Sequence, residues 1–179
     1  MQPPICTIDT SFVIALDILD LLPQLSVLFS RVLLPRGVRA ELFKRRTTKD
    51  RLRKLIRSYA FIVRCDDYDR GAVDILLIER ARQGVEDRGE TEAIVQAANL
   101  GATVIVDDPW GRQLADWTQL EYHGTLWVLR RLHELELLPG PALRDGLTRL
   151  RAQGIRLPLR DANDLLMQID ESPLGEPDA

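Results

Sequence analysis

Short apolar runs alternate with longer helix-like stretches along most of the chain, and this alternation limits the folds that its 179 residues can adopt. Four runs are continuous and only three or four residues long: 5–8, 32–34, 61–63 and 103–106. Strands buried on both faces have this pattern, whereas strands with one wet face alternate apolar and polar residues. The sequence therefore predicts an α/β fold in which helices cover a parallel sheet.

The stretches between these runs have the apolar spacing of amphipathic helices. The first is broken near Pro23, and the segment 90–100 ends at Gly101, a residue typical of a helix C-cap. The helices predicted along the chain are 11–29, 37–44, the basic segment 44–57, 73–84, 90–100, 110–118, 126–137, 142–153 and 161–169.

Composition indicates a soluble, folded protein. Hydrophobic residues make up 45% of the chain and charged residues 28%, so there is enough apolar surface to offset the entropy of ordering. No apolar run reaches the roughly 18 residues of a membrane span, and no secretory signal precedes the first strand. Cys6 and Cys65 are too few for a disulfide framework. We expect a cytoplasmic protein with reduced thiols and no membrane partner.

Charge is distributed unevenly along the chain. Residues 44–57 contain eight basic residues and one acid, although the net charge of the whole chain is −3. Residues 161–179 contain six acids and no base. A positive segment on an acidic body suits a ligand that carries phosphate, and a solvated helix face has the same composition.

Acidic residues follow two of the predicted strands. Asp9 comes directly after the first strand, and Asp107 and Asp108 come after the fourth. Glu41 and Glu90 lie on predicted helices. Because the carboxyl ends of parallel strands open onto one edge of a sheet, we expect these acids to lie close together. Clustered carboxylates repel one another unless protons or cations neutralise them, and Mg²⁺ or Mn²⁺ prefers such oxygen ligands.

Each of these acids also has a structural explanation. Asp9 is a candidate cap for the helix that follows it, and Asp87 and Glu90 have the spacing of a capping box. Asp108 before Pro109 is typical of a helix start. The combination of acids at one predicted edge, and no single acid, is what favours a metal site.

The sequence lacks the motifs of several other enzyme classes. It has no Gly-x-Gly-x-x-Gly, no Gly-Lys-Ser/Thr and no Gly-x-Ser-x-Gly motif. Its histidines are His123 and His133, and Leu137 stands where a zinc-protease motif starting at His133 needs its second histidine. A receiver-like phosphoacceptor domain needs a late lysine, and no lysine follows Lys54.

Five short motifs occur in a fixed order between residues 5 and 156. They are Ile8-Asp9-Thr10-Ser11, Leu34-Pro35-x-x-Val38-x-x-Glu41-Leu42, Gly89-Glu90-x-Glu92-Ala93-Ile94, Val106-Asp107-Asp108-x-x-x-Arg112-x-x-Ala115 and Gly124-Thr125-Leu126-Trp127-Val128-Leu129. Together they resemble the PIN-domain ribonucleases, and in particular the VapC-type toxins of toxin–antitoxin pairs.

The resemblance implies a three-layer α/β/α domain with a central parallel sheet, which we place over residues 1–158. The composition of residues 159–179 predicts an acidic C-terminal helix and a loose tail, because the end of the chain is polar and contains two prolines. The resemblance also implies a Mg²⁺- or Mn²⁺-dependent endoribonuclease that is the toxin of a toxin–antitoxin pair. Its partners would be RNA, an antitoxin protein and a second copy of itself in a homodimer. A non-catalytic PIN-like module that binds RNA or protein is the alternative.

The catalytic acids implied by the resemblance are Asp9, Glu41, Glu90 and Asp108. The expected metal ligands are Asp9, Asp108, Glu90 and Asp107. Glu92 competes with Glu90 for its place, and Asp107 competes with Asp108. We favour Asp108, because adjacent strand residues point to opposite faces and Ala115 follows Asp108 by the seven residues of the family pattern.

The resemblance to a ribonuclease gives the basic segment a role. Arginine binds phosphate through two parallel hydrogen bonds, and such contacts hold an RNA backbone without reading its sequence. The residues expected to bind RNA are Arg45, Arg46, Arg53 and Arg112.

Overall fold

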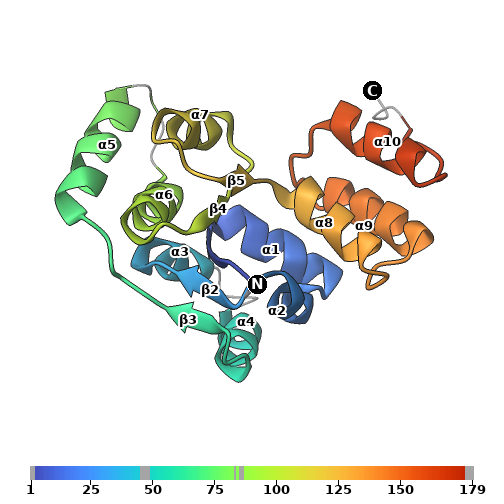
Figure 1. Ribbon diagram of the computed structural model, residues 1–179, viewed down its shortest axis with the longest axis horizontal. Coiled ribbons are helices and arrows are strands. Elements are labelled where there is room, and N and C mark those ends of the chain that lie inside the picture. Colours follow the sequence, from blue (N-terminus) through green and yellow to red (C-terminus); the bar gives the residue numbers. More distant parts are fainter. Residues whose placement is uncertain (1–2, 45–48, 83, 85–86, 176–179) are drawn as a thin grey trace.

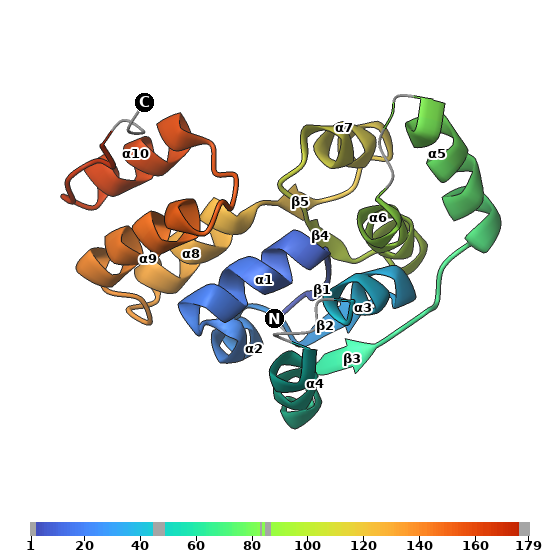
Figure 2. The same ribbon diagram turned by 180° about the vertical axis from the view of Figure 1, so that it is seen from behind.

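The computed structural model describes residues 3–44, 49–82, 84 and 87–175. Its centre is a five-stranded parallel sheet in the order β3-β2-β1-β4-β5. Helices lie on both sides of this sheet (Figures 1 and 2), which confirms the predicted three-layer α/β/α fold. The strands are β1 (Ile5–Ile8), β2 (Arg31–Leu34), β3 (Ile62–Arg64), β4 (Thr103–Ile105) and β5 (Tyr122–His123).

The helices agree with the sequence-based expectations to within a few residues at their ends. Strand β5 was not predicted, because its two residues are too few to show a pattern. In chain order the helices are α1 (Thr10–Leu19), the 3₁₀ turn η1 (Leu22–Gln24), α2 (Leu25–Leu28), α3 (Arg36–Leu42), α4 (Lys49–Ser58), α5 (Arg70–Arg82), α6 (Arg88–Leu100), α7 (Pro109–Trp117), α8 (Thr125–Glu134), α9 (Gly140–Ala152) and α10 (Leu159–Gln168).

Acidic side chains cap the helices α1, α6 and α7, which begin near the predicted site. An Oδ atom of Asp9 accepts a hydrogen bond from the Phe12 amide (2.8 Å), and Asp87 accepts one from the Glu90 amide (2.9 Å). Asp108 accepts one from the Trp110 amide (2.9 Å). These bonds satisfy amides that have no partner within the helix. The predicted caps by Asp9, Asp87 and Asp108 are therefore confirmed, and they place three acids at the starts of α1, α6 and α7. The capping box is only half formed, because the Glu90 carboxylate faces Arg80.

The side chains of β1 alternate between two cores. Cys6 and Ile8 belong to the larger core, which the helices α1, α8, α9 and α10 share. Thr7 faces the other layer, where its hydroxyl donates to the Ala93 carbonyl oxygen of α6 (2.9 Å). A smaller core lies between α6, α7 and β4. Both faces of the sheet are thus buried, which explains why its strands are continuous apolar runs.

The C-terminal helices are part of the main core. Leu165 and Leu166 of α10 are buried in the cluster that also contains α1 side chains, so the core continues past residue 158. The Leu174 amide donates to the Asn163 side chain (2.8 Å), and Arg144 donates to the Ser172 carbonyl oxygen (2.9 Å). These hydrogen bonds attach Ser172 and Leu174 to α9 and α10, and the looseness of the tail stays a prediction.

No single helix in the described ranges is long and apolar enough to cross a membrane. The pair formed by α1 and the segment Leu22–Leu28 reaches that length and composition only when the two parts are taken together, and the chain bends by 114° between them. Phe12, Leu16 and Leu25 in this pair are buried in the protein core.

Candidate active site

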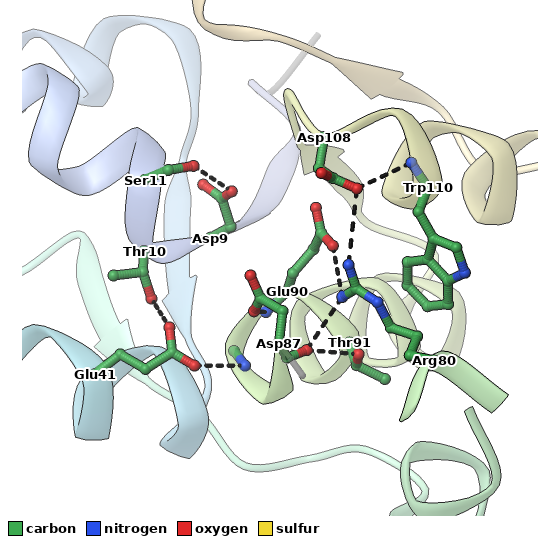
Figure 3. A network of polar contacts seen from close by, with 11 residues as sticks. Asp9, Thr10, Ser11, Glu41, Arg80, Asp87, Glu90, Thr91, Asp108 and Trp110 are labelled. Carbon is green, nitrogen blue, oxygen red and sulfur yellow. Dashed lines mark hydrogen bonds and ion pairs between the residues drawn. The ribbon is translucent and has the colours of Figure 1, made fainter. Parts of the chain in front are cut away.

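Four acids meet beyond the carboxyl ends of β1 and β4, among α1, α6 and α7 (Figure 3). Asp9 follows β1, Asp87 and Glu90 lie at the start of α6, and Asp108 begins α7. The charges of the other three acids all act on the Glu90 carboxyl group. The structure thus brings Asp9, Glu90 and Asp108 together, and adds Asp87, which sequence reasoning treated only as a cap.

Asp9 is 6% exposed, and its carboxylate is held by hydrogen-bond donors of α1. The Ser11 hydroxyl donates to Oδ2 (2.6 Å) and the Phe12 amide donates to Oδ1 (2.8 Å). Burial raises the pKa of Asp9 to about 7, and the charges of Asp107 and Asp87 add to the rise against those two hydrogen bonds. No basic side chain in the described ranges forms an ion pair with Asp9.

Glu90 is as deeply buried as Asp9 but faces a cation. Its side chain and that of Arg80 are both 2% exposed, and Nη1 of Arg80 lies 2.8 Å from Oε2 of Glu90. Burial raises the pKa of Glu90 to about 8, Arg80 opposes that rise, and the charge of Asp108 adds to it. Nη1 donates to the Asp87 carbonyl oxygen (3.2 Å), and Oε2 of Glu90 accepts no hydrogen bond from the described residues.

Arg80 reaches into the acid cluster from α5, which lies outside α6 (Figures 1 and 3). Its guanidinium group lies 3.9 Å from the centre of the Trp110 ring, and Nη2 is 3.7 Å from Oδ1 of Asp108. Sequence reasoning missed Arg80, because one arginine on a helix carries no sign that its side chain is buried. The apolar residues around it predicted the helix and not the contact.

Asp107 points away from its neighbour Asp108. Its carboxylate accepts a hydrogen bond from the Thr125 amide (3.0 Å) and another from the Thr125 hydroxyl, and Nη2 of Arg112 lies 3.3 Å away. The charge of Asp107 acts on Asp9, whereas the charge of Asp108 acts on Glu90. Asp107 therefore lies on the Asp9 side of the cluster, and Asp108 lies on its Glu90 side.

Glu41 joins the cluster through its neighbours. Its Oε1 accepts from the Gly89 amide (2.9 Å), and its Oε2 accepts from the Thr10 hydroxyl. Each partner is one residue away from a clustered acid, so Glu41 ties α3 to the starts of α1 and α6 (Figure 3). A Cβ atom on Gly89 would lie 2.7 Å from a Glu41 oxygen, which explains the glycine at this position.

Glu92 faces away from the cluster. Its Oε2 accepts from the Gly37 amide (2.5 Å), and Nη1 of Arg88 lies 3.2 Å from Oε1. The Gly37 bond holds α6 against the start of α3, whereas the Arg88 contact lies within α6 itself. The sequence did not decide whether Glu90 or Glu92 is the acid of the site, and in the structure Glu90 lies beside Asp9 and Asp108.

A family model described as a PIN domain matches residues 5–171. The chain belongs to the PIN-domain family. No curated protein matches the chain significantly. PIN domains are usually nucleases, and they typically use a divalent metal ion. The resemblance at family level is thereby confirmed, and the narrower likeness to VapC-type toxins stays a prediction.

The clustered acids of this PIN domain offer oxygen ligands of the kind that bind divalent cations. Carboxylate oxygens are the ligands that Mg²⁺ prefers. Asp9 has no ion pair in the described residues, and Oε2 of Glu90 has the Arg80 guanidinium at 2.8 Å but no hydrogen bond from it. Among those residues, no group of three or more acids is already close enough to hold an ion. The donor set therefore fits a metal by its chemistry, although the described side chains are not arranged around an ion.

The predicted RNA-binding arginines fall in different places. Arg112 contacts Asp107 and so lies next to the acid cluster. Arg53 lies on α4, where its guanidinium group is 4.5 Å from the Phe43 ring centre, and α4 lies beside β3 (Figure 1). Arg45 and Arg46 lie outside the described residues. RNA binding by these arginines stays a prediction.

Proposed function

We propose that this PIN domain is a Mg²⁺-dependent endoribonuclease that hydrolyses RNA phosphodiester bonds. The observation that carries the proposal is the meeting of four acids at the carboxyl edge of the sheet, where Arg80 is the one basic side chain of the described residues that forms ion pairs with them. The pKa of Asp9 is raised to about 7 and that of Glu90 to about 8, so folding holds two carboxyl groups where ionisation is costly. A bound divalent cation would compensate that cost, and proteins arrange such costs at functional sites.

The residues of the cluster have separate roles in this proposal. Asp9, Glu90 and Asp108 are the metal ligands, with Asp107 beside Asp9 as the alternative fourth acid. When bound, Mg²⁺ would lower the pKa of a water molecule and offset charge on the phosphate oxygens. Glu41 is a positioning residue, because its oxygens hold Thr10 and the Gly89 amide. Arg112 is placed to bind a phosphate of the RNA backbone.

The biological setting is a further part of the proposal. The order of the five motifs supports a toxin of a toxin–antitoxin pair that works in the cytoplasm as a homodimer and is bound by an antitoxin protein. A small gene that overlaps the start of this one would agree with that setting. Light scattering that shows a monomer at every concentration would contradict the homodimer.

Cleavage of single-stranded RNA by the purified protein tests the enzymatic proposal. We expect cleavage with Mg²⁺ or Mn²⁺, loss of cleavage in EDTA, and its return when Mg²⁺ is added in excess. Glu90→Gln should abolish cleavage, whereas Asp116→Asn, an exposed acid of α7 outside the cluster, should cleave at the normal rate. Full activity in excess chelator would contradict the metal-dependent reaction.

One observation favours the non-catalytic alternative, in which the PIN domain only binds RNA or protein. Arg80 already supplies a positive charge to Glu90 and Asp108, so that side of the cluster is partly compensated without a metal. If RNA binding survives in the wild-type protein while no divalent cation supports cleavage, the alternative is the correct function.

A further inference from the structure

A cavity opens beside the acid cluster, between α10 and the start of α8. Its volume is about 360 Å³, within the range of pockets that bind small organic ligands. Both aromatic and charged side chains line it, including Arg112, His123, Trp127, Arg130, Asp161 and Asp164. We call this cavity the nucleotide pocket, for the reasons that follow.

One wall of the pocket is a fixed aromatic surface. The rings of His123 and Trp127 are stacked, with their centres 3.7 Å apart and their planes inclined by 1°. Nε2 of His123 lies 3.2 Å from Oε1 of Glu121, which holds the imidazole in this position. RNA-binding proteins recognise unpaired bases by stacking them on such rings, and a ring that is already fixed loses little entropy when a base binds.

The charges around the pocket are separated by sign. Arg112 and Arg130 come from α7 and α8, whereas Asp161 and Asp164 come from α10. The arginines attract a phosphate group and the carboxylates repel it. Carboxylates accept hydrogen bonds from the N–H groups of a base edge. A nucleotide would therefore bind in one direction, with its phosphate toward α7 and α8 and its base toward α10.

One side chain links the pocket to Asp107, the acid next to the cluster whose charge acts on Asp9. Nη2 of Arg112, which lines the pocket, lies 3.3 Å from Oδ1 of Asp107. A Cβ atom on Gly124 would lie 2.5 Å from that oxygen and 2.6 Å from Nη2 of Arg112. Only glycine at position 124 leaves room for the contact between Arg112 and Asp107. The backbone at this position therefore permits a pocket residue to reach an acid of the site.

We infer that the nucleotide pocket binds one unpaired nucleotide of the RNA substrate, next to the bond that the acid cluster cuts. The inference rests on the proposed function, because it names the part of the substrate that the site recognises. It restricts that substrate to single-stranded RNA, since a base in a duplex cannot reach the aromatic wall.

Binding of a fluorescently labelled single-stranded RNA oligonucleotide in EDTA, measured by anisotropy, tests the inference without any cleavage. Trp127→Leu removes the stacking surface and should weaken binding by about fivefold or more. Arg130→Gln should weaken binding and reduce the slope of log K against log salt by about 0.7. The matched controls are Trp117→Leu, an exposed tryptophan of α7, and Arg131→Gln, which also pairs with Glu134 but does not line the pocket.

The outcomes separate this inference from the proposed function. RNA binding that Trp127→Leu and Arg130→Gln weaken, in a protein that never cleaves, would support the pocket and overturn the enzyme. Cleavage with unchanged affinity in both variants would overturn the pocket and leave the enzyme standing. Binding of an arginine-rich peptide at this site in place of RNA, or loss of a dimer in Trp127→Leu with RNA affinity unchanged, would also overturn the inference. Arg130 is half-exposed, so Arg130→Gln carries the test if Trp127→Leu lowers the melting temperature.

Discussion

Asp9 and Glu90 are both deeply buried acids at one edge of the sheet, yet their negative charges have different partners. Asp9 receives only hydrogen bonds, from Ser11 and Phe12, whereas Glu90 faces the Arg80 guanidinium at 2.8 Å. Hydrogen bonds from uncharged donors lower the cost of a buried charge without cancelling it. The Asp9 half of the cluster therefore depends on a proton or an external cation, and the Glu90 half carries a cation of its own.

This difference suggests that Asp9 and Glu90 have different roles in the proposed metal site. A carboxylate with no counter-ion is the one whose ionisation a bound metal would stabilise most, so we assign the principal metal contact to Asp9. The Glu90 half resembles a structural ion pair that a metal must share or displace. Arg80 is held in place by Trp110 and by the Asp87 carbonyl oxygen, so displacing it would cost several contacts.

Asp9→Asn is the change with the largest expected effect. Asparagine keeps the cap of α1 but cannot carry the charge, so RNA cleavage should fall by at least about a thousandfold. Because the folded-state pKa of about 7 lies above the ordinary 3.8, ionised Asp9 destabilises the fold above pH 7, and this penalty disappears below about pH 4.

The same variant should therefore unfold at higher urea concentration than the wild type at pH 8, by about 1–3 kcal/mol in free energy of unfolding. At pH 4 the two proteins should be equally stable. If Asp9→Asn destabilises the protein at pH 8, then Asp9 is already compensated in the fold and the two halves do not differ as proposed.

Arg80→Met tests the other half of the comparison. It leaves Glu90 buried without its cation, so the free energy of unfolding should fall by about 3–5 kcal/mol. Arg80→Met combined with Glu90→Gln should restore most of that loss, since no unpaired charge remains. Arg82→Met, an exposed arginine of the same helix, is the matched control and should change stability by less than about 0.5 kcal/mol. Equal effects of both methionine variants would mean that the Arg80 contact contributes nothing.

The affinity for Mn²⁺ should rise with pH between about 6 and 8.5. Metal ligands must lose their protons, and the pKa values of Asp9 and Glu90 are raised to about 7 and about 8. Each proton released gives up to about a tenfold gain in affinity per pH unit. Calorimetric titrations at several pH values measure this slope, and Asp9→Asn should lower it. An affinity that does not change over this range would show that neither acid takes part in metal binding.

The fold and most of the acid cluster could be predicted from the sequence because local patterns encode them. Continuous apolar runs predicted the strands, and capping acids at strand ends placed Asp9 and Asp108 at one edge of the sheet. Arg80 and the choice between Glu90 and Glu92 could not be predicted, because they depend on which way a side chain points across a tertiary interface. The hydrophobic periodicity of the sequence does not predict that α5 packs over α6, nor that the Arg80 side chain contacts the Trp110 ring.

The smallest expected effect on stability separates Asp107 from Asp108, and so decides to which half the fourth acid belongs. Asp108 is half-exposed, and asparagine caps a helix about as well, so Asp108→Asn should change the free energy of unfolding by only a few tenths of a kcal/mol. Asp107→Asn loses its ion pair with Arg112 and one acceptor for Thr125, which should cost about 1–2 kcal/mol. We expect Asp108→Asn to lose RNA cleavage despite its normal stability. The opposite result, in which Asp107→Asn loses cleavage and Asp108→Asn retains it, would make Asp107 the fourth catalytic acid. The metal would then be bound by Asp9 and Asp107, on the side of the cluster that Arg80 does not reach.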